Sequence, residues 1–439
     1  MSNINPSRLF TASCVALTVT SMTFAIRAGM LDPLGKEFNL SEQQLAWIAG
    51  MAFFGFPVAT TIGGFFVDQF GMRRLMWVAF GAHLLGLLLT IFAGGFWTLF
   101  ISTFFVGFAN GMVEAVCNPL VASMYPNNKT VMLNRFHVWF PGGIVIGALL
   151  AAAIKTQFVD VEGNLIPEKI ALMRQLQVAT MLLPTLVYGW LFWGQSFPRT
   201  ERVTTGVSTA AMFKAVRTPL FLFMALCMFF TANTELSTGQ WIEKLLGNAG
   251  ANALLILALV NGLMALGRYF GGPLIHRLNP TGILLGSAFF SLLGVYMLRT
   301  MEGPSLYAAA VVFAIGVCYF WPTMLGFVSE NIPKSGALGL SLMGGAGMLG
   351  NWAYQTFYIG PKLDLEKKTN ALNMGYQEVS ALSGEALQKF LNGLPKEALD
   401  QIELTAGRSV LSNINLLPIF LIVAFTALWF YMRGRKSED

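Results

Sequence analysis

The chain has 439 residues, of which 55% are hydrophobic and only 11% are charged, with a formal net charge of +6. A soluble domain carries about 25% charged residues, so the composition excludes an ordinary soluble protein and indicates an integral membrane protein. The basic residues lie in short segments between apolar runs, so the net charge does not indicate nucleic-acid binding. The four cysteines all lie inside apolar runs and predict neither a disulfide framework nor a metal site.

Twelve apolar segments of the length needed to cross a bilayer follow one another along the chain. Lipid offers no partner for free backbone groups, so we expect each of these segments to span as a helix. The predicted fold class is therefore all-α and integral to the membrane. The segments lie near 9–31, 44–66, 75–94, 98–122, 133–154, 171–194, 219–241, 251–271, 281–299, 304–327, 336–358 and 410–432.

The loops between the segments predict the orientation of the chain. Most Lys and Arg residues, among them Arg73, Arg74 and Arg268, fall in alternate loops, and the positive-inside rule places these loops and both termini in the cytoplasm. We expect a plasma membrane, in particular a bacterial inner membrane. The long polar stretch 359–409 then lies outside, and the helical apolar spacing within 378–403 predicts a helical hairpin there.

The sequence also repeats itself weakly. Asp68 follows a Gly-Gly pair after the second segment, and His276 follows another Gly-Gly pair 208 residues later. Pro119 in the fourth segment has a counterpart in Pro322 of the tenth, 203 residues later. Such a duplication is typical of secondary transporters. It predicts a six-helix bundle over 1–194, a cytoplasmic linker over 195–218 and a second six-helix bundle over 219–439 with its long outer loop at 359–409.

The segment that follows the second apolar run reads Gly64-Phe-Phe-Val-Asp68-Gln-Phe-Gly71-Met-Arg73-Arg74. A plain positively charged loop would explain Arg73 and Arg74, but not Asp68 with its two spaced glycines. The pattern closely resembles the loop signature of the major facilitator superfamily. That resemblance implies twelve helices in two pseudo-symmetric bundles, with substrate bound between them near the bilayer midplane. It also implies a cytoplasmic gate that contains Gly64, Asp68, Gly71 and Arg73.

A narrower resemblance covers roughly residues 107–147. Glu114, followed by Asn118-Pro119 and later by Leu133-Asn134, is similar to the fucose/galactose/glucose–proton symporter family. In that family the corresponding glutamate takes part in substrate and proton handling, and the resemblance implies this role for Glu114. The family carries an aspartate in the outer half of the first span. This chain differs there, because Arg27 is the charge inside the span.

Three ionisable residues lie well inside predicted spans, namely Arg27, Glu114 and Glu235. A lone charge in lipid costs several kcal/mol, so each is a candidate functional residue. Arg27 and Glu235 are 208 residues apart, the offset of the loop motifs, and their pairing would close an outer gate. Glu114 is the competing partner of Arg27. Glu114 is also the candidate for binding the coupling cation, which is a proton or a sodium ion; sodium would use the Asn118 oxygen as well.

Amides and tryptophans at depth predict the substrate contacts. Amides bind hydroxyl groups and aromatic faces pack on apolar C–H patches, which is the chemistry that a sugar site needs. His137, near one end of the fifth span, is predicted to be a contact between helices. The predicted substrate-contacting residues are Asn118, Trp139, Gln240, Trp241 and Asn351.

The function predicted from these features is cation-coupled uptake of a small hydroxylated solute, a monosaccharide, by alternating access. One alternative is transport of an anionic or amphipathic solute that Arg27 recognises. Another, of a different class, is a solute sensor or scaffold that does not transport. The sequence has neither a Walker loop nor a paired acidic cluster, and it holds three histidines, so we expect no enzyme, no metal site and no cofactor besides the coupling ion. The expected partners are a small-molecule substrate and the bilayer, without nucleic acid, and the protein is expected to be a monomer.

Overall fold

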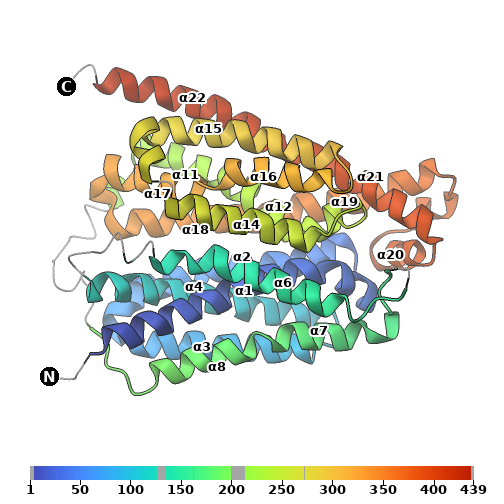
Figure 1. Ribbon diagram of the computed structural model, residues 1–439, viewed down its shortest axis with the longest axis horizontal. Helices are drawn as coiled ribbons and strands as arrows, with labels where there is room; N and C mark the ends of the chain where they lie inside the picture. Colours follow the sequence, from blue (N-terminus) through green and yellow to red (C-terminus); the bar gives the residue numbers. More distant parts are fainter. Residues whose placement is uncertain are drawn as a thin grey trace. The chain divides into compact units, whose positions relative to one another are not determined.

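The computed structural model describes residues 4–125, 132, 135–161, 163–198, 213–270 and 272–436 (Figure 1). Within these ranges the chain is almost entirely helical, and one isolated β-bridge pairs Val159 with Leu165. The predicted all-α fold class is confirmed. Lys129, Leu133, Asn134 and most of the predicted linker, residues 199–212, lie outside the described residues.

Eleven helical stretches in the described part of the chain are long and apolar enough to cross a membrane. The remaining predicted segment, 336–358, corresponds to α18 (Gly336–Tyr354), which is also helical. All twelve predicted segments are therefore helices. The others are α1 (Pro6–Phe38), α2 (Glu42–Phe70), α3 (Met72–Ile91), α4 (Phe96–Met124), α6 (Trp139–Lys155), α7 (Ile170–Ala179) with α8 (Leu182–Phe192), α11 (Pro219–Ala232), α14 (Ala253–Phe270), α15 (Gly272–Thr300), α16 (Ser305–Val317) with α17 (Phe320–Asn331), and α21 (Lys396–Ile414) with α22 (Leu416–Lys436).

The helices form two compact units. Unit 1 contains α1 to α8 together with the later segments Gln355–Asp364 and Leu382–Gly393. Unit 2 contains α11 to α18, the segment Leu365–Ala381 and the chain from Leu394 onward. The division of the described helices between the units therefore follows the two halves of the sequence, except for the two short segments that pack in unit 1.

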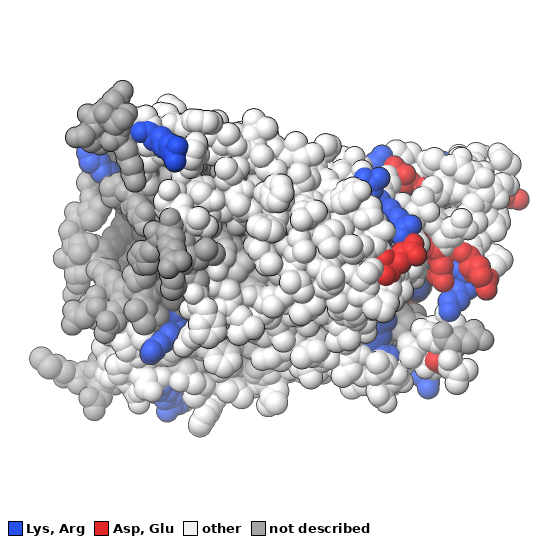
Figure 2. All heavy atoms as spheres, turned by 45° about the horizontal axis from the view of Figure 1, so that its top comes forward, with Lys and Arg blue, Asp and Glu red and all other residues white. Residues whose placement is uncertain are grey.

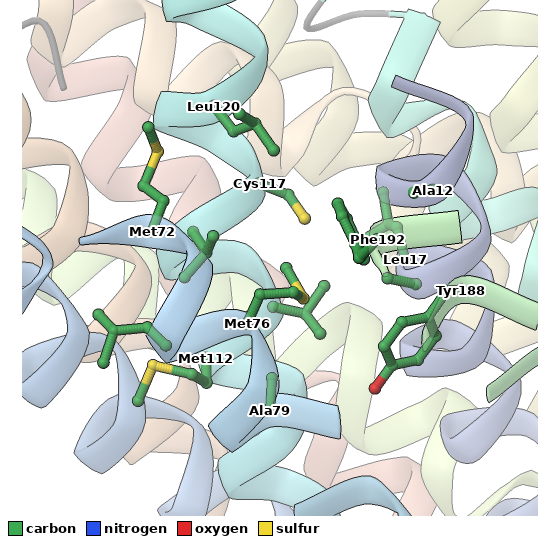
Figure 3. Packing of buried hydrophobic residues seen from close by; sticks show 14 of the residues in the cluster. Ala12, Leu17, Met72, Met76, Ala79, Met112, Cys117, Leu120, Tyr188 and Phe192 are labelled. Carbon is green, nitrogen blue, oxygen red and sulfur yellow. The ribbon is translucent and has the colours of Figure 1, made fainter. Parts of the chain in front are cut away.

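Small residues set the closest packing in unit 1. On α4, a Cβ atom added at Gly107 or Gly111 would collide with the main-chain carbonyls of Ala52 or Phe56 on α2. Only glycine allows the two helix backbones to approach so closely, as in other membrane helix pairs. The core beside this contact contains buried side chains of α1, α2, α3, α4 and α8 together with Phe136. The labelled side chains of α1, α3, α4 and α8 face one another in Figure 3.

Several spans are interrupted, which the apolar patterns do not predict. The sixth span breaks between α7 and α8 just before Pro184, which has no N–H to donate to the preceding turn. The seventh span continues from α11 through the π-helical turn η2 (Asn233–Ser237) into α12 (Thr238–Gln240) and α13 (Ile242–Leu246). A second π-helical turn, η4 (Gln355–Ile359), follows α18. π-Helical turns often occur at functional sites.

The polar stretch predicted at 359–409 is helical, as expected, but contains more helix than a hairpin. It forms α19 (Gly360–Asn373), the 3₁₀ turn η5 (Gln377–Ala381), α20 (Gly384–Asn392) and the first turns of α21. On the face shown in Figure 2, charged side chains lie near the ends of the helices, and the surface between them carries almost none. This distribution suits helices whose middle parts lie in lipid.

Candidate functional site

Glu114 lies in a small group of polar side chains in unit 1. Glu114 and Asn118 are one turn apart on α4, so they lie on the same side of that helix. The Asn118 amide nitrogen Nδ2 donates to Glu114 Oε2 at 3.3 Å, and Asn118 Oδ1 lies 2.9 Å from Nε2 of His137. All three side chains are half-buried. We call Glu114, Asn118 and His137 the carboxylate cluster.

The hydrogen bonds of the carboxylate cluster have a defined direction. A carboxylate can only accept, so the Asn118 amide nitrogen faces Glu114 and the amide oxygen faces the histidine. His137 Nε2 must then carry a hydrogen and donate it, an assignment that follows from the network. The sequence predicted His137 as a contact between helices. In the structure His137 does contact another helix, because Asn118 lies on α4, and the same hydrogen bond places it one amide away from the carboxylate.

Arg27 is almost fully buried in unit 1, with 5% of its surface exposed. Its guanidinium carbon lies 5.0 Å from the centre of the Phe24 ring and 5.5 Å from that of the Phe53 ring. Such cation–π contacts stabilise a buried cation. Arg27 also lines a small cavity of about 30 Å³, whose other lining residues include Thr23, Thr90 and Thr103.

Glu235, in unit 2, lies on the π-helical turn η2. Its Oε1 is 3.4 Å from Nη2 of Arg268 on α14, and Arg268 Nε donates to the carbonyl of Cys318 at 2.9 Å. Sequence reasoning counted Arg268 among the cytoplasmic loop cations and did not see it as a partner of Glu235. The available signal was its position inside the eighth apolar segment. Arg27 belongs to the other unit, so its predicted pairing with Glu235 stays a prediction.

The predicted substrate contacts of unit 2 are deeply buried. Trp241 and Asn351 are 0% exposed and Gln240 is 3% exposed. Asn351 Nδ2 donates to the Ala232 carbonyl at 2.9 Å, and Ser237 Oγ donates to Asn351 Oδ1 at 3.1 Å. Asn351 therefore ties α18 to the π-helical turn. In unit 1, by contrast, Trp139 at the start of α6 is 45% exposed.

The predicted gate motif spans the junction of α2 and α3. Gly71, between the two helices, has φ 77°, a backbone conformation that favours glycine. Arg73 lies exposed in the first turn of α3. Gly64 and Asp68 belong to α2, but their side-chain surroundings lie outside what the structure describes. The gating role of all four residues stays a prediction.

A second group of polar residues in unit 1 was missed by sequence reasoning. The Tyr188 hydroxyl lies 2.8 Å from Nδ1 of His83, and His83 Nε2 lies 2.8 Å from Asn110 Oδ1. Asn110 Nδ2 then donates to Thr23 Oγ1 at 2.9 Å. All four side chains are at most 3% exposed. We call these four residues the polar chain; the available signal was a polar residue inside each of four apolar segments.

Residues 11–353 match the family model described as Major Facilitator Superfamily. The chain belongs to this superfamily. Its members are multi-pass membrane transporters and not enzymes, and the family is the one that the loop signature predicted. The narrower resemblance to the fucose permease family stays a prediction.

Curated relatives match parts of the chain. A D-xylose transporter of Levilactobacillus brevis is 31% identical over 124 residues, which is 28% of this chain and 26% of the relative. A mouse protein named solute carrier family 2, facilitated glucose transporter member 10, is 28% identical over 34% of this chain and 28% of its own length. A zebrafish (Danio rerio) sphingosine-1-phosphate transporter is 25% identical over 29% of this chain and 26% of its own length. The chain thus spans about a quarter of the length of each of these relatives.

Solved structures share the fold over nearly the whole chain. A bacterial homologue of the human lysosomal transporter Spinster superposes with a TM-score of 0.74 at 15% identity and covers 96% of both chains. A D-xylose–proton symporter gives a TM-score of 0.67 at 13% identity, over 91% of this chain and 96% of the other. These likenesses establish the twelve-helix fold of the superfamily.

Proposed function

We propose that this transporter moves a small hydroxylated solute of the monosaccharide class together with a proton, and that Glu114 carries the proton. The observation that carries the proposal is the half-buried carboxylate of Glu114 on a membrane-spanning helix, held by the Asn118 amide at 3.3 Å. An ionisable side chain inside a membrane costs free energy, so such a residue usually has a functional role. The sugar-transporter names of two relatives support the substrate class.

The contacts of Asn118 favour a proton over a sodium ion. A sodium site at Glu114 would need further oxygen ligands, and the sequence suggested the Asn118 amide oxygen. In the structure that oxygen lies 2.9 Å from His137 Nε2, and the amide nitrogen faces the carboxylate instead. A proton needs no such set of oxygens. Protonation of one carboxylate is the simpler coupling step for this arrangement.

A second candidate is an anionic or amphipathic solute recognised by Arg27. Arg27 is a buried cation packed over two phenylalanine rings, so its surroundings combine positive charge with apolar surface. A sphingosine-1-phosphate transporter is among the relatives. Both features suit a ligand with an acidic head and an apolar body. A role as a sensor without transport has no such observation in its favour.

Counterflow in proteoliposomes tests the proposal. Vesicles are loaded with D-xylose, D-glucose, L-fucose, lactate or a lysophospholipid, and wild type is compared with Glu114→Gln and Arg27→Gln. Counterflow needs no ion gradient, so it separates substrate choice from coupling. We expect exchange of a neutral sugar by wild type and by Glu114→Gln, and loss of proton-driven accumulation in Glu114→Gln alone.

Two other outcomes would change the assignment. Exchange of anions or the lysophospholipid only, abolished by Arg27→Gln, would replace the sugar with the second candidate. Accumulation driven by sodium and not by protons would identify sodium as the coupling ion.

We also propose that both termini face the cytoplasm of a bacterial inner membrane and that the protein acts as a monomer. Labelling of single cysteines introduced near each terminus checks the orientation.

A further inference from the structure

We propose that His137 is a second proton-carrying residue of the coupling site, and that rotation of the Asn118 side chain links its protonation to that of Glu114. This inference rests on the proposed function, because it adds a residue to the same site. It starts from one feature of the carboxylate cluster. A single amide separates the carboxylate from the imidazole, at 3.3 Å on one side and 2.9 Å on the other.

An amide placed between two groups has two orientations. In the orientation of the structure, Nδ2 donates to the ionised Glu114 and Oδ1 accepts from His137 Nε2–H. This orientation requires a carboxylate without a proton on Oε2. It also requires a hydrogen on His137 Nε2, which both the imidazolium and one neutral tautomer provide.

Adding a proton to Glu114 Oε2 requires the opposite orientation of the Asn118 amide. The new O–H would face the N–H of the amide, two donors in opposition, so the Asn118 amide must turn by about 180° to offer its oxygen. Its nitrogen then points at His137 Nε2, which has to accept. The hydrogen on Nε2 must leave.

The proton balance of this step is closed. Glu114 gains one proton on Oε2. If His137 was an imidazolium, it releases its Nε2 proton and stays neutral with a hydrogen on Nδ1, so one proton has moved from histidine to glutamate. If His137 was neutral, its hydrogen leaves Nε2, and Nδ1 takes one up from water. In either case Glu114 Oε2 and His137 Nε2 do not both carry a hydrogen that points at the Asn118 amide.

The surroundings of the cluster allow water to take part. Glu114, Asn118 and His137 are each half-buried, whereas the polar chain around His83 is closed off. Among the described residues, the thiol of Cys117 on α4 interacts electrostatically with Glu114 and with Cys14 on the neighbouring α1. His137 is preceded by the exposed Arg135. In this proposal the glutamate and the histidine are the two groups of the cluster that exchange protons with solvent.

The first test compares the pH dependence of transport in matched variants. The half-saturation concentration of D-xylose in counterflow is measured from pH 5.5 to 8.5, a range that brackets the ordinary histidine pKa of about 6.5. The proteins are wild type, Glu114→Gln, His137→Gln and the double variant. Glutamine keeps a hydrogen-bonding group near the Nε2 position but does not titrate. Coupled sites change each other's affinity by about 5- to 150-fold. We expect a pH-dependent change in this range for wild type and little change in His137→Gln, in Glu114→Gln and in the double variant.

His83→Gln is the matched control, because it also replaces a membrane-buried histidine. It should lower the yield and thermal stability of the protein but leave the pH dependence of the remaining transport unchanged. If Glu114→Gln removes the pH dependence and His137→Gln does not, Glu114 couples alone and this inference is wrong. If neither variant changes it, the proposed function itself fails.

A second measurement needs no substrate. The chain has three histidines, so ¹⁵N-histidine spectra of the protein in lipid can be assigned with His83→Gln and His137→Gln. We expect the titration of His137 to move when Glu114 is replaced by glutamine, and the signals of His83 to stay in place. A His137 titration that is identical in wild type and Glu114→Gln would overturn the proposed link.

Discussion

Unit 1 contains two hydrogen-bonded groups that use the same residue types for different ends. In the polar chain, His83 bonds to an amide, Asn110, through Nε2, and in the carboxylate cluster His137 does the same with Asn118. Both asparagines lie on α4. The polar chain ends at a threonine and is buried throughout, whereas the carboxylate cluster ends at Glu114 and is half-buried.

The direction of donation explains the difference. In the polar chain every step is satisfied by neutral groups: Tyr188 donates to His83, His83 to Asn110, and Asn110 to Thr23. Thr23 in turn donates to the Thr20 carbonyl at 2.6 Å. An added proton would form no further hydrogen bond within the polar chain. In the carboxylate cluster, by contrast, Glu114 can be ionised or protonated. The partial exposure of this cluster gives it access to water. The polar chain is therefore structural and the carboxylate cluster is the functional candidate.

The largest expected effect is that of Glu114→Gln on coupled transport. Replacing the carboxylate removes the group that changes its charge, so the accumulation ratio under a proton gradient should fall to about 1, a loss of at least tenfold if coupling is worth ~1.4 kcal/mol. Uptake driven by an imposed pH gradient measures it. Counterflow by the same preparation is the control, and an accumulation ratio equal to that of wild type would contradict the assignment.

Next in size is Arg268→Gln, which extends the comparison to the ion pair of unit 2. Without Arg268, the Glu235 carboxylate would remain charged and unpaired. Removing one partner of a buried ion pair costs about 3–5 kcal/mol of stability. The cost should be smaller here, because both side chains are partly exposed. We expect a clear loss of thermal stability in detergent. Glu235→Gln should cost less, and the double variant should recover part of the loss. Equal melting temperatures for all variants would show that the pair contributes nothing.

A smaller loss of stability is expected for Asn110→Leu in the polar chain. This change removes the partner of His83 Nε2 and the donor to Thr23 Oγ1, which keeps its bond to the Thr20 carbonyl. A buried polar group left unsatisfied costs about 1–3 kcal/mol. The melting temperature should fall while the pH dependence of transport is retained. A changed pH dependence in a variant that still folds would mean that the polar chain is not merely structural.

The smallest effect on stability should come from Asn118→Leu in the carboxylate cluster. Glu114 and His137 are half-buried, so water can replace the lost amide, and we expect a cost of about 1 kcal/mol or less. Coupling, in contrast, should be impaired, because leucine cannot link the two groups. Asn110→Leu should therefore lower stability and keep coupling, whereas Asn118→Leu should keep stability and impair coupling. Melting curves measure stability, and proton-driven uptake measures coupling. Identical effects of the two variants would remove the distinction between the groups.

Much of the fold could be predicted from the sequence, because the requirement to bury backbone in lipid leaves a strong local signal. All twelve apolar segments are helices, and the loop signature around Asp68 indicated the superfamily that residues 11–353 match. The break before Pro184 and the π-helical turn at Glu235 were not predicted. A proline alone does not indicate a break, because Pro33, Pro57 and Pro119 lie inside continuous helices.

By itself the sequence determined which residues carry charge into the membrane, because an ionisable residue within an apolar run is visible locally: Arg27, Glu114 and Glu235. Only the tertiary structure decided the hydrogen-bonded surroundings of Glu114 and Glu235 and the contacts of the polar chain. His137 is 19 residues from Asn118, Arg268 is 33 from Glu235, and Tyr188 is 105 from His83. A side-chain hydrogen bond depends on helix rotation and on atomic distances of about 3 Å, and apolar periodicity does not encode contacts between separate helices at that precision.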